Sequence, residues 1–220
     1  DYIVALTEID KTLMLASQKD LNIYVSPAVI KLPDTKYSFD HVGQELVVVG
    51  SGEHFPNADG MMWFCKEVLP LIKKKCNIKI NIVGKWKKRL QEEMLKIEPS
   101  LYFTGYIEDL NEFMNGKISI VPIRIGSGMR IKLLDSVWAA SPIVTTSKGC
   151  EGLPFVDGKN CLIADSAQDF ANAIMRMLEN KDNMQKKLTE SSAETISGII
   201  DSTQLIERRM KLYRNIKKEK

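Results

Sequence analysis

The residues best suited to chemistry lie in one short segment, residues 124–135. Gly126 and Gly128 stand just before a helical pattern, so backbone N–H groups there are open to a ligand and the helix dipole favours an anion. Arg130 and Lys132 add two positive charges, which an isolated helix N-terminus would disfavour by about 0.3–1 kcal/mol each. Because a bound diphosphate would resolve this conflict, we predict an anion site in this segment.

The simpler interpretation is a tight turn whose glycines serve packing and whose charges are incidental. The segment is neither a Walker loop nor the dinucleotide fingerprint, because it lacks the Gly-Lys-Ser/Thr ending and a third glycine. Asp135 follows Lys132 by three residues, a spacing that fits an intrahelical ion pair as well as a carboxylate that accepts hydrogen bonds from sugar hydroxyls. Glu151 lies between two glycines, where it could cap the turn at Gly152 or reach the same pocket.

Other reaction classes find little support. The two histidines, His41 and His54, have no partners for a serine-histidine-acid hydrolase, and no cluster has the spacing of metal ligands. The four cysteines show no paired short spacing, so we expect reduced, mostly buried thiols of a cytoplasmic protein, not a zinc site or disulfide framework. They are Cys65, Cys76, Cys150 and Cys161.

The charge of the chain is weak, with a formal net value of +3 over 220 residues. Lysines cluster at 73–75, 85–89 and 217–220, and we interpret them as solvated helix faces and a tail, not as a nucleic-acid surface. Peripheral association with the inner face of a membrane is an alternative use of the same lysines. No apolar run reaches the roughly 18 residues of a transmembrane helix.

The elements that position these residues alternate between strand and helix. We predict strands at 46–49, 80–83, 101–103, 118–121, 142–145 and 161–163, and helices at 58–75, 86–96, 108–114, 129–140 and 167–180. This alternation implies right-handed crossovers, and therefore an α/β, doubly wound, mostly parallel six-stranded sheet covered on both faces. In such a sheet ligands bind beyond the carboxyl ends of the strands.

The sequence predicts separate structural units at the two ends of the chain. Residues 1–35 suggest a strand-helix-strand unit, residues 36–198 contain the doubly wound domain, and residues 199–220 include an amphipathic helix. The sequence opens at Asp1 within a strand-like run, so we expect a fragment of a longer protein.

Several motifs, in order, resemble the donor-site signature of the family 4, or group 1, glycosyltransferases of the GT-B fold. The main match is residues 121–135, which read VPIRIGSGMRIKLLD, and it continues through 141–146 and 149–153. Earlier pieces agree at 49–51, 56–57, 67–70, 82–84 and 103–110, so that the resemblance covers roughly residues 44–180. Each motif alone is unspecific, but the set in this order is specific.

The resemblance implies a nucleoside-diphosphate sugar bound at the Rossmann-like C-terminal half of a two-domain enzyme. Arg130 and Lys132 would be the catalytic residues, because they would hold the diphosphate and stabilise the leaving group. Asp135 matches an acid that contacts the ribose, and Tyr106 and Ile107 match the loop that lines the base. The expected donor-binding residues are Gly50, Ser51, Tyr106, Ile107, Gly126, Ser127, Gly128, Met129, Asp135 and Glu151.

Members of the family mostly retain the anomeric configuration and need neither metal nor further cofactor. The resemblance also implies a surface-polysaccharide or glycolipid acceptor, bound mainly by a preceding domain of which residues 1–35 are the remnant. Residues 199–220 would cross back to that domain, and this chain alone would bind nucleotide without transferring sugar.

The chain departs from the family pattern at two places. Ser127 and Asp135 stand where many relatives have a pair of glutamates, and Ser51-Gly52-Glu53 replaces a basic pair. A degenerate, non-catalytic nucleotide-binding module and another GT-B enzyme, such as a sugar-nucleotide epimerase, are the alternatives. A phosphorylase fits poorly, since no lysine lies in a context suited to a pyridoxal cofactor.

Overall fold

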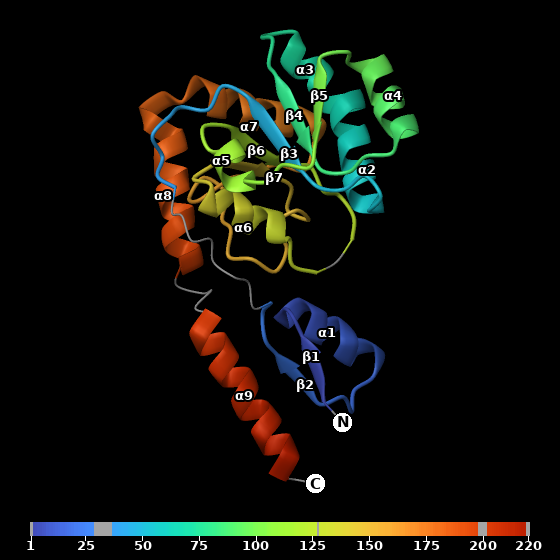
Figure 1. The fold of residues 1–220 in the computed structure, drawn as a ribbon, viewed down its shortest axis with the longest axis vertical. Coiled ribbons are helices and arrows are strands. Elements are labelled where there is room, and N and C mark those ends of the chain that lie inside the picture. Colours follow the sequence, from blue (N-terminus) through green and yellow to red (C-terminus); the bar gives the residue numbers. More distant parts are fainter. Residues whose placement is uncertain (1, 29–36, 127, 198–201, 219–220) are drawn as a thin grey trace.

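A computed structural model describes residues 2–28, 37–126, 128–197 and 202–218 (Figure 1). A six-stranded parallel sheet forms the centre of the larger unit. Its strands are β3 (Leu46–Val49), β4 (Ile80–Val83), β5 (Leu101–Gly105), β6 (Ile118–Val121), β7 (Ile143–Thr145) and β8 (Leu162–Ile163).

The sheet order is β5-β4-β3-β6-β7-β8, and each neighbouring pair is parallel. The predicted doubly wound α/β fold is therefore confirmed. From β3 the chain adds strands outward on one side, β4 and then β5, and from β6 it adds them on the other side, β7 and then β8. The two halves meet at β3 and β6, which pair through Leu46 with Ile118 and Val47 with Ser119. The loops that leave these two strands run to opposite faces, and this switch point is where open α/β sheets bind ligands.

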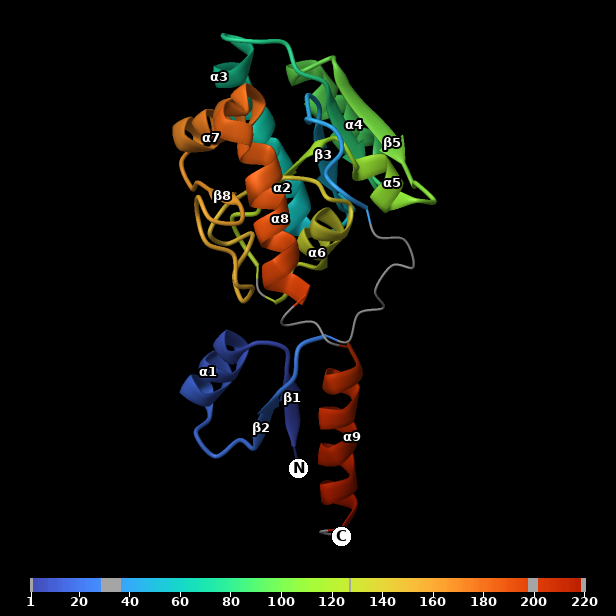
Figure 2. The same ribbon diagram turned by 90° about the vertical axis from the view of Figure 1, so that its left-hand side faces the viewer.

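Helices cover both faces of the sheet (Figure 2). Leu46 and Val48 belong to one core cluster, whereas Val47 lies in another on the opposite face, as expected for a strand buried on both sides. The helices of this unit are α2 (Phe55–Trp63), α3 (Leu69–Lys73), α4 (Lys88–Ile97), α5 (Leu110–Met114), α6 (Ile131–Trp138), α7 (Ala167–Glu179) and α8 (Met184–Ser197).

Two predicted helices differ from the structure. The pattern at 58–75 begins earlier, at Phe55, and contains a π-helical turn at Phe64–Val68 in which Leu69 N–H bonds to the carbonyl of Phe64. Pro70 follows and has no N–H to continue a regular ladder, which explains the interruption. Trp86 is buried in the core, but it lies before the start of α4 and not inside the helix predicted at 86–96.

The N-terminal unit is a parallel pair of strands with one helix: β1 (Ile3–Ala5), α1 (Glu8–Ser17) and β2 (Ile23–Val25). The strand-helix-strand order predicted for this part of the chain is confirmed, and the helix is capped by Thr7, whose side chain accepts a hydrogen bond of 3.0 Å from Asp10 N. In both views α9 (Ser202–Lys218) lies beside this pair (Figures 1 and 2). Arg209 of α9 donates to Ser26 Oγ at 2.8 Å, and its guanidinium also donates to the carbonyl oxygen of Pro27 at 2.7 Å.

The cysteines are free thiols: Cys65, Cys150 and Cys161 are buried and Cys76 is half-buried. Burial raises the pKa of Cys65 and of Cys161 to about 12, so these two thiols are protonated at neutral pH. Within the described part of the chain, no helix combines the length and apolarity needed to cross a bilayer.

Candidate functional site

The switch point brings Lys132 of α6 to the carboxyl end of β3. Lys132 Nζ donates a hydrogen bond of 2.6 Å to Asn57 Oδ1 in the first turn of α2. The same Asn57 carboxamide donates from Nδ2 to the carbonyl oxygen of Ser51 at 2.8 Å. One side chain therefore links the loop after β3, the start of α2 and the start of α6.

Gly50 permits this approach because it has no side chain. A Cβ atom at Gly50 would lie 2.6 Å from Asn57 Nδ2, which is too short for a real contact, and 3.0 Å from Lys132 Nζ, which is tighter than most real contacts. The predicted donor-binding residues Gly50 and Ser51 thus lie beside the predicted catalytic residue Lys132, as expected from the topology of the sheet.

Lys132 is a poorly neutralised cation. Burial, together with the nearby positive charge of Arg130, lowers its pKa from 10.5 to about 8, while Asp135 opposes this shift. Lys132 and Asp135 make no ion pair within 4.0 Å in the described structure, so the intrahelical pair that the spacing allowed is not formed. The strongest contact of this ammonium is a neutral amide.

Asp135 is the matching carboxylate on the same helix. Burial raises its pKa from 3.8 to about 6, and the positive charge of Lys132 only partly offsets that effect. Above this pKa the carboxylate is ionised and available as a hydrogen-bond acceptor. It lies one helical turn beyond Lys132, on the same face of α6.

Arg130 is the second predicted catalytic residue, and only 8% of its surface is exposed. Burial lowers its pKa, whereas the negative charge of Glu151 raises it. The helix begins two residues later than predicted, at Ile131, because Gly128 has a positive φ of 86° and Arg130 a non-helical ψ of 86°. Arg130 is therefore the N-cap residue, and its guanidinium donates to Ile125 O at 3.4 Å.

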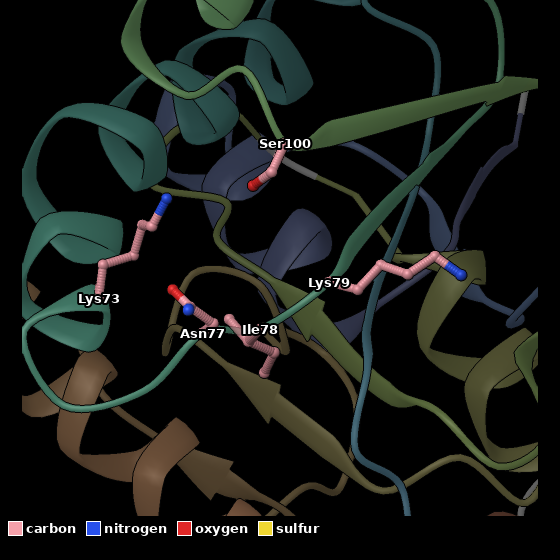
Figure 3. A pocket seen from close by; sticks show the side chains of 5 residues that line it. All are labelled: Lys73, Asn77, Ile78, Lys79 and Ser100. Atoms are coloured by element: carbon pink, nitrogen blue, oxygen red, sulfur yellow. The ribbon is translucent and has the colours of Figure 1, made fainter.

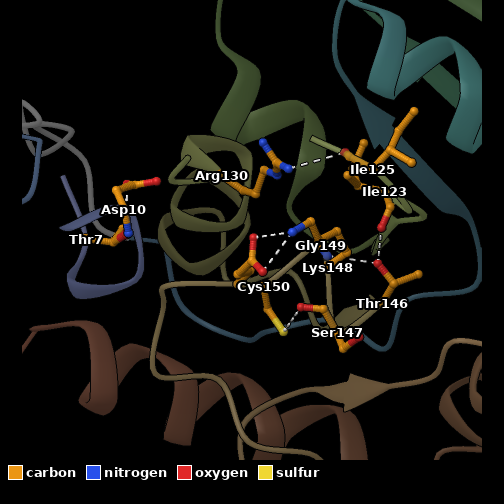
Figure 4. A network of polar contacts seen from close by, with 11 residues as sticks. Thr7, Asp10, Ile123, Ile125, Arg130, Thr146, Ser147, Lys148, Gly149 and Cys150 are labelled. Atoms are coloured by element: carbon orange, nitrogen blue, oxygen red, sulfur yellow. Dashed lines mark hydrogen bonds and ion pairs between the residues drawn. The ribbon is translucent and has the colours of Figure 1, made fainter. Parts of the chain in front are cut away.

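Glu151 belongs to the turn after β7, whose residues Thr146 to Cys150 are labelled in Figure 4, and its negative charge acts on Arg130. Its carboxylate accepts hydrogen bonds of 2.8 and 2.7 Å from Lys148 Nζ. These bonds, and not a cap on Gly152, account for its orientation. Gly152 instead lies against the N-terminal unit, since a Cβ there would come within 2.8 Å of Thr7 Cγ2.

The remaining predicted residues are less closely gathered. Gly126 lies close to Arg130, because a Cβ at Gly126 would be 3.1 Å from Arg130 Nη2. Tyr106 is 87% exposed in the loop after β5, whereas Ile107 is partly buried against the core. Met129 is also partly buried against a core cluster, so its side chain contributes to packing. Ser127 lies outside the described residues.

Asn57 is not among the predicted site residues, although it lies in the matched piece at 56–57, just before the helix predicted at 58–75. Its signal was its position at the start of the first helix after the switch-point strand. Asp59 was not predicted either, and its carboxylate accepts bonds of 2.8 and 3.1 Å from Arg124. Arg124 lies 5.5 Å from the ring centre of Trp63, so this ion pair ties α2 to the loop that carries the two glycines.

A cavity of about 320 Å³ lies at the opposite end of the sheet (Figure 3). Its lining residues are Lys73, Asn77, Ile78, Lys79 and Ser100, which precede or flank the amino ends of β4 and β5. Lys73 Nζ is 2.6 Å from Glu98 Oε2, and the other oxygen of Glu98 accepts from Ser100 N at 3.0 Å. Lys73, Glu98 and Ser100 at this cavity therefore hydrogen-bond to one another.

Comparison with known proteins gives the family of the chain and the fold that it shares with solved structures. The sequence profile described as "Glycosyl transferases group 1" matches residues 43–180. A protein of Klebsiella pneumoniae, described as an uncharacterized 44.6 kDa protein in the cps region, is 31% identical over 140 residues, which are 59% of this chain and 36% of that protein.

Two solved structures are similar in fold. S. aureus TarM, crystallised with ligands that include UDP, has a TM-score of 0.79 at 15% identity, over 96% of this chain and 43% of TarM. The pneumococcal O-GlcNAc transferase GtfA, crystallised with UDP and GlcNAc, has a TM-score of 0.75 at 14% identity, over 98% of this chain and 45% of GtfA. The chain spans less than half the length of each of these proteins.

The profile covers more than half of the chain, and it contains both strands of the switch point and the Arg130–Lys132 segment. The chain therefore belongs to the group 1 glycosyltransferases, and its six-stranded domain has the GT-B fold of that family.

Proposed function

We propose that this chain is the donor-binding part of a glycosyltransferase and holds the diphosphate of a nucleoside-diphosphate sugar at Arg130 and Lys132. The observation that carries this proposal is the Lys132 ammonium, held by the neutral Asn57 carboxamide beside Arg130 at the switch point. Arg130 and Lys132 are neighbouring cations, and Asp135, the carboxylate that acts on Lys132, only partly offsets the lowering of its pKa, so the site suits a ligand with two or more negative charges.

The relatives support the same ligand class. TarM was crystallised with UDP, GtfA with UDP and GlcNAc, and the Anabaena protein HepE with UDP and glucose. The relative from Klebsiella pneumoniae is named for a cps region. We further propose that the acceptor is a surface polysaccharide or glycolipid. It would be bound mainly by a further domain of a longer protein, and residues 1–35 would be part of that domain.

The chemistry follows from where charge develops. When the bond between the sugar and the diphosphate breaks, negative charge accumulates on the leaving diphosphate. Donors that are already in place there lower the barrier, and removal of one such donor typically costs about 10²–10³ in rate. Lys132 and Arg130 are such donors, and Asp135 is placed to accept from donor hydroxyl groups. We propose that transfer retains the anomeric configuration and needs no metal, as in most of the family.

Calorimetry with uridine and guanosine diphosphates, their monophosphates and the nucleosides tests the proposal. We expect micromolar affinity for at least one diphosphate and about 10-fold or more weaker binding of its monophosphate, because the second phosphate adds charge-assisted hydrogen bonds. No detectable binding of either diphosphate would contradict a donor site and favour a degenerate module.

A transfer assay separates the further claims. With a nucleotide-sugar and acceptor supplied, we expect this 220-residue chain to bind the donor but to transfer no sugar. Turnover by this chain alone would contradict the assignment of the acceptor to another domain. Interconversion of one nucleotide-sugar into its epimer would instead identify the epimerase alternative.

A further inference from the structure

The carboxamide of Asn57 is engaged at both ends. Nδ2 donates to the carbonyl oxygen of Ser51 at 2.8 Å, which leaves Oδ1 pointing at Lys132 Nζ, 2.6 Å away. Because the Nδ2 bond fixes which end of the amide faces Lys132, the ammonium always meets an acceptor. The backbone carbonyl of Ser51 therefore helps to fix the orientation of this side chain.

The support behind Asn57 is rigid. Its own N–H bonds to His54 O at 3.0 Å in the first turn of α2. The loop that supplies the Ser51 carbonyl is tied to the next strand, since Gly50 N–H bonds to Val83 O at 3.0 Å and Gly52 N–H bonds to Lys85 O at 2.9 Å. Asn57 therefore connects the Lys132 ammonium to a loop that is hydrogen-bonded to the sheet.

The chemical type of this acceptor matters as much as its position. The charged groups that act on Lys132 are Arg130 and Asp135, both from its own segment. From α2 the neutral Asn57 contacts the ammonium, whereas the carboxylate of Asp59 on the same helix is paired with Arg124. A carboxylate at position 57 would neutralise the ammonium and repel phosphate. An amide orients the ammonium and leaves its full charge for the ligand.

We propose that Asn57 is a positioning residue of the donor site, which aims the Lys132 ammonium at the diphosphate without neutralising it. This inference rests on the proposed function, because it assumes that Lys132 binds phosphate. It adds a residue that lies outside the Arg130–Lys132 segment and that acts through Lys132.

The test compares Asn57→Asp and Asn57→Ala with Asn172→Asp, a matched change on the exposed surface of α7. Affinity for inorganic pyrophosphate and for uridine and guanosine diphosphates is measured from pH 6 to pH 10, and thermal unfolding checks that each variant is folded. We expect Asn57→Asp to weaken binding by about tenfold or more at pH 7 and Asn172→Asp to change it less than about twofold.

The pH profile distinguishes positioning from a structural role. In the wild type, affinity should fall as Lys132 loses its proton near pH 8. Asn57→Asp should move this fall to higher pH, because a carboxylate stabilises the ammonium, whereas Asn57→Ala should weaken binding by about threefold or more without raising the pH of the fall. If Asn57→Asp does not fold, the affinity of Asn57→Ala for the same ligands tests the inference, which fails if this variant binds as tightly as the wild type.

The inference is overturned if the wild type binds these probes and both folded Asn57 variants bind them equally well. It is also overturned if Asn57→Asp weakens binding while the pH of the fall stays unchanged. If the wild type binds neither pyrophosphate nor a nucleoside diphosphate, the proposed function itself fails.

Discussion

Two lysines at opposite ends of the same sheet have different environments. Lys73, at the amino end, lies 2.6 Å from the Glu98 carboxylate, which is only 5% exposed and also accepts from Ser100. Lys132, at the carboxyl end, faces the Asn57 amide with Arg130 close by. A lysine paired with a carboxylate stabilises the fold, whereas a buried lysine without such a partner has charge available for a ligand.

The shifted pKa values express the same difference. Burial alone would raise the pKa of Glu98, but the hydrogen bonds from Lys73 and Ser100 outweigh it and lower that pKa. Burial and Arg130 lower the pKa of Lys132 to about 8. At the amino end the fold favours the Glu98 carboxylate, and at the carboxyl end it holds a positive charge at Lys132 that is costly without an anion.

The largest expected effect is on ligand affinity. Lys132→Met should weaken binding of a nucleoside diphosphate by about 100-fold, because a charge-assisted contact to the diphosphate is lost. Lys73→Met, the matched change at the other end of the sheet, should alter affinity less than about twofold. Calorimetry at pH 7 measures both. Equal losses in the two variants would mean that general charge, and not the Lys132 site, attracts the ligand.

The same two variants should change stability in opposite directions. Lys73→Met leaves the Glu98 carboxylate buried without its cation, and we expect it to lower the free energy of unfolding by about 1–3 kcal/mol at pH 7. Lys132→Met removes a poorly neutralised buried charge, and we expect it to raise that free energy by about 1 kcal/mol. Urea denaturation measures both.

The stability changes in the two variants should depend on pH in different ways. The pKa of Lys132 is depressed in the fold, so its penalty is full below about pH 8, and the gain from Lys132→Met should vanish above its ordinary pKa of 10.5. The pKa of Glu98 is also depressed, so its contribution is present above its ordinary pKa of 4.5 and is lost at lower pH. The penalty of Lys73→Met should therefore shrink in acid. A gain from Lys132→Met that persists at pH 11 would contradict this explanation.

The smallest expected effect concerns Asp135, whose carboxylate lies on the same face as Lys132. Asp135→Asn removes a negative charge, so inorganic pyrophosphate should bind about 2- to 5-fold more tightly. A nucleoside diphosphate should lose part or all of this gain, because the proposed contact to the ribose is weakened. If both ligands gain equally, Asp135 affects only the electrostatics and does not touch the ribose.

Local patterns were enough to predict the six strands, because each is an apolar run of the right length between turn residues. The anion site at Arg130 and Lys132 could also be predicted, because the sequence alone shows two cations at a helix N-terminus, where the helix dipole disfavours them. Asn57 was not readable as a site residue, because its role depends on a partner 75 positions away. The loop position of Trp86, which packs against Phe103, likewise depends on a tertiary contact that periodicity does not contain.

The absence of the Lys132–Asp135 ion pair shows the same limit. Spacing places both residues on one helical face, but Asn57 provides the acceptor that Lys132 uses. Whether an (i, i+3) pair forms is decided by the neighbouring element, which the helix sequence does not specify.

Proton uptake on binding tests the central claim most directly. At pH 8, where a free nucleoside diphosphate is fully ionised, Lys132 should be about half protonated, and binding should draw in about half a proton per ligand. Calorimetry in two buffers of different ionisation enthalpy measures this number. We predict uptake by the wild type and none by Lys132→Met; equal uptake by both proteins, or none by a wild type that binds, would contradict a diphosphate held by Lys132.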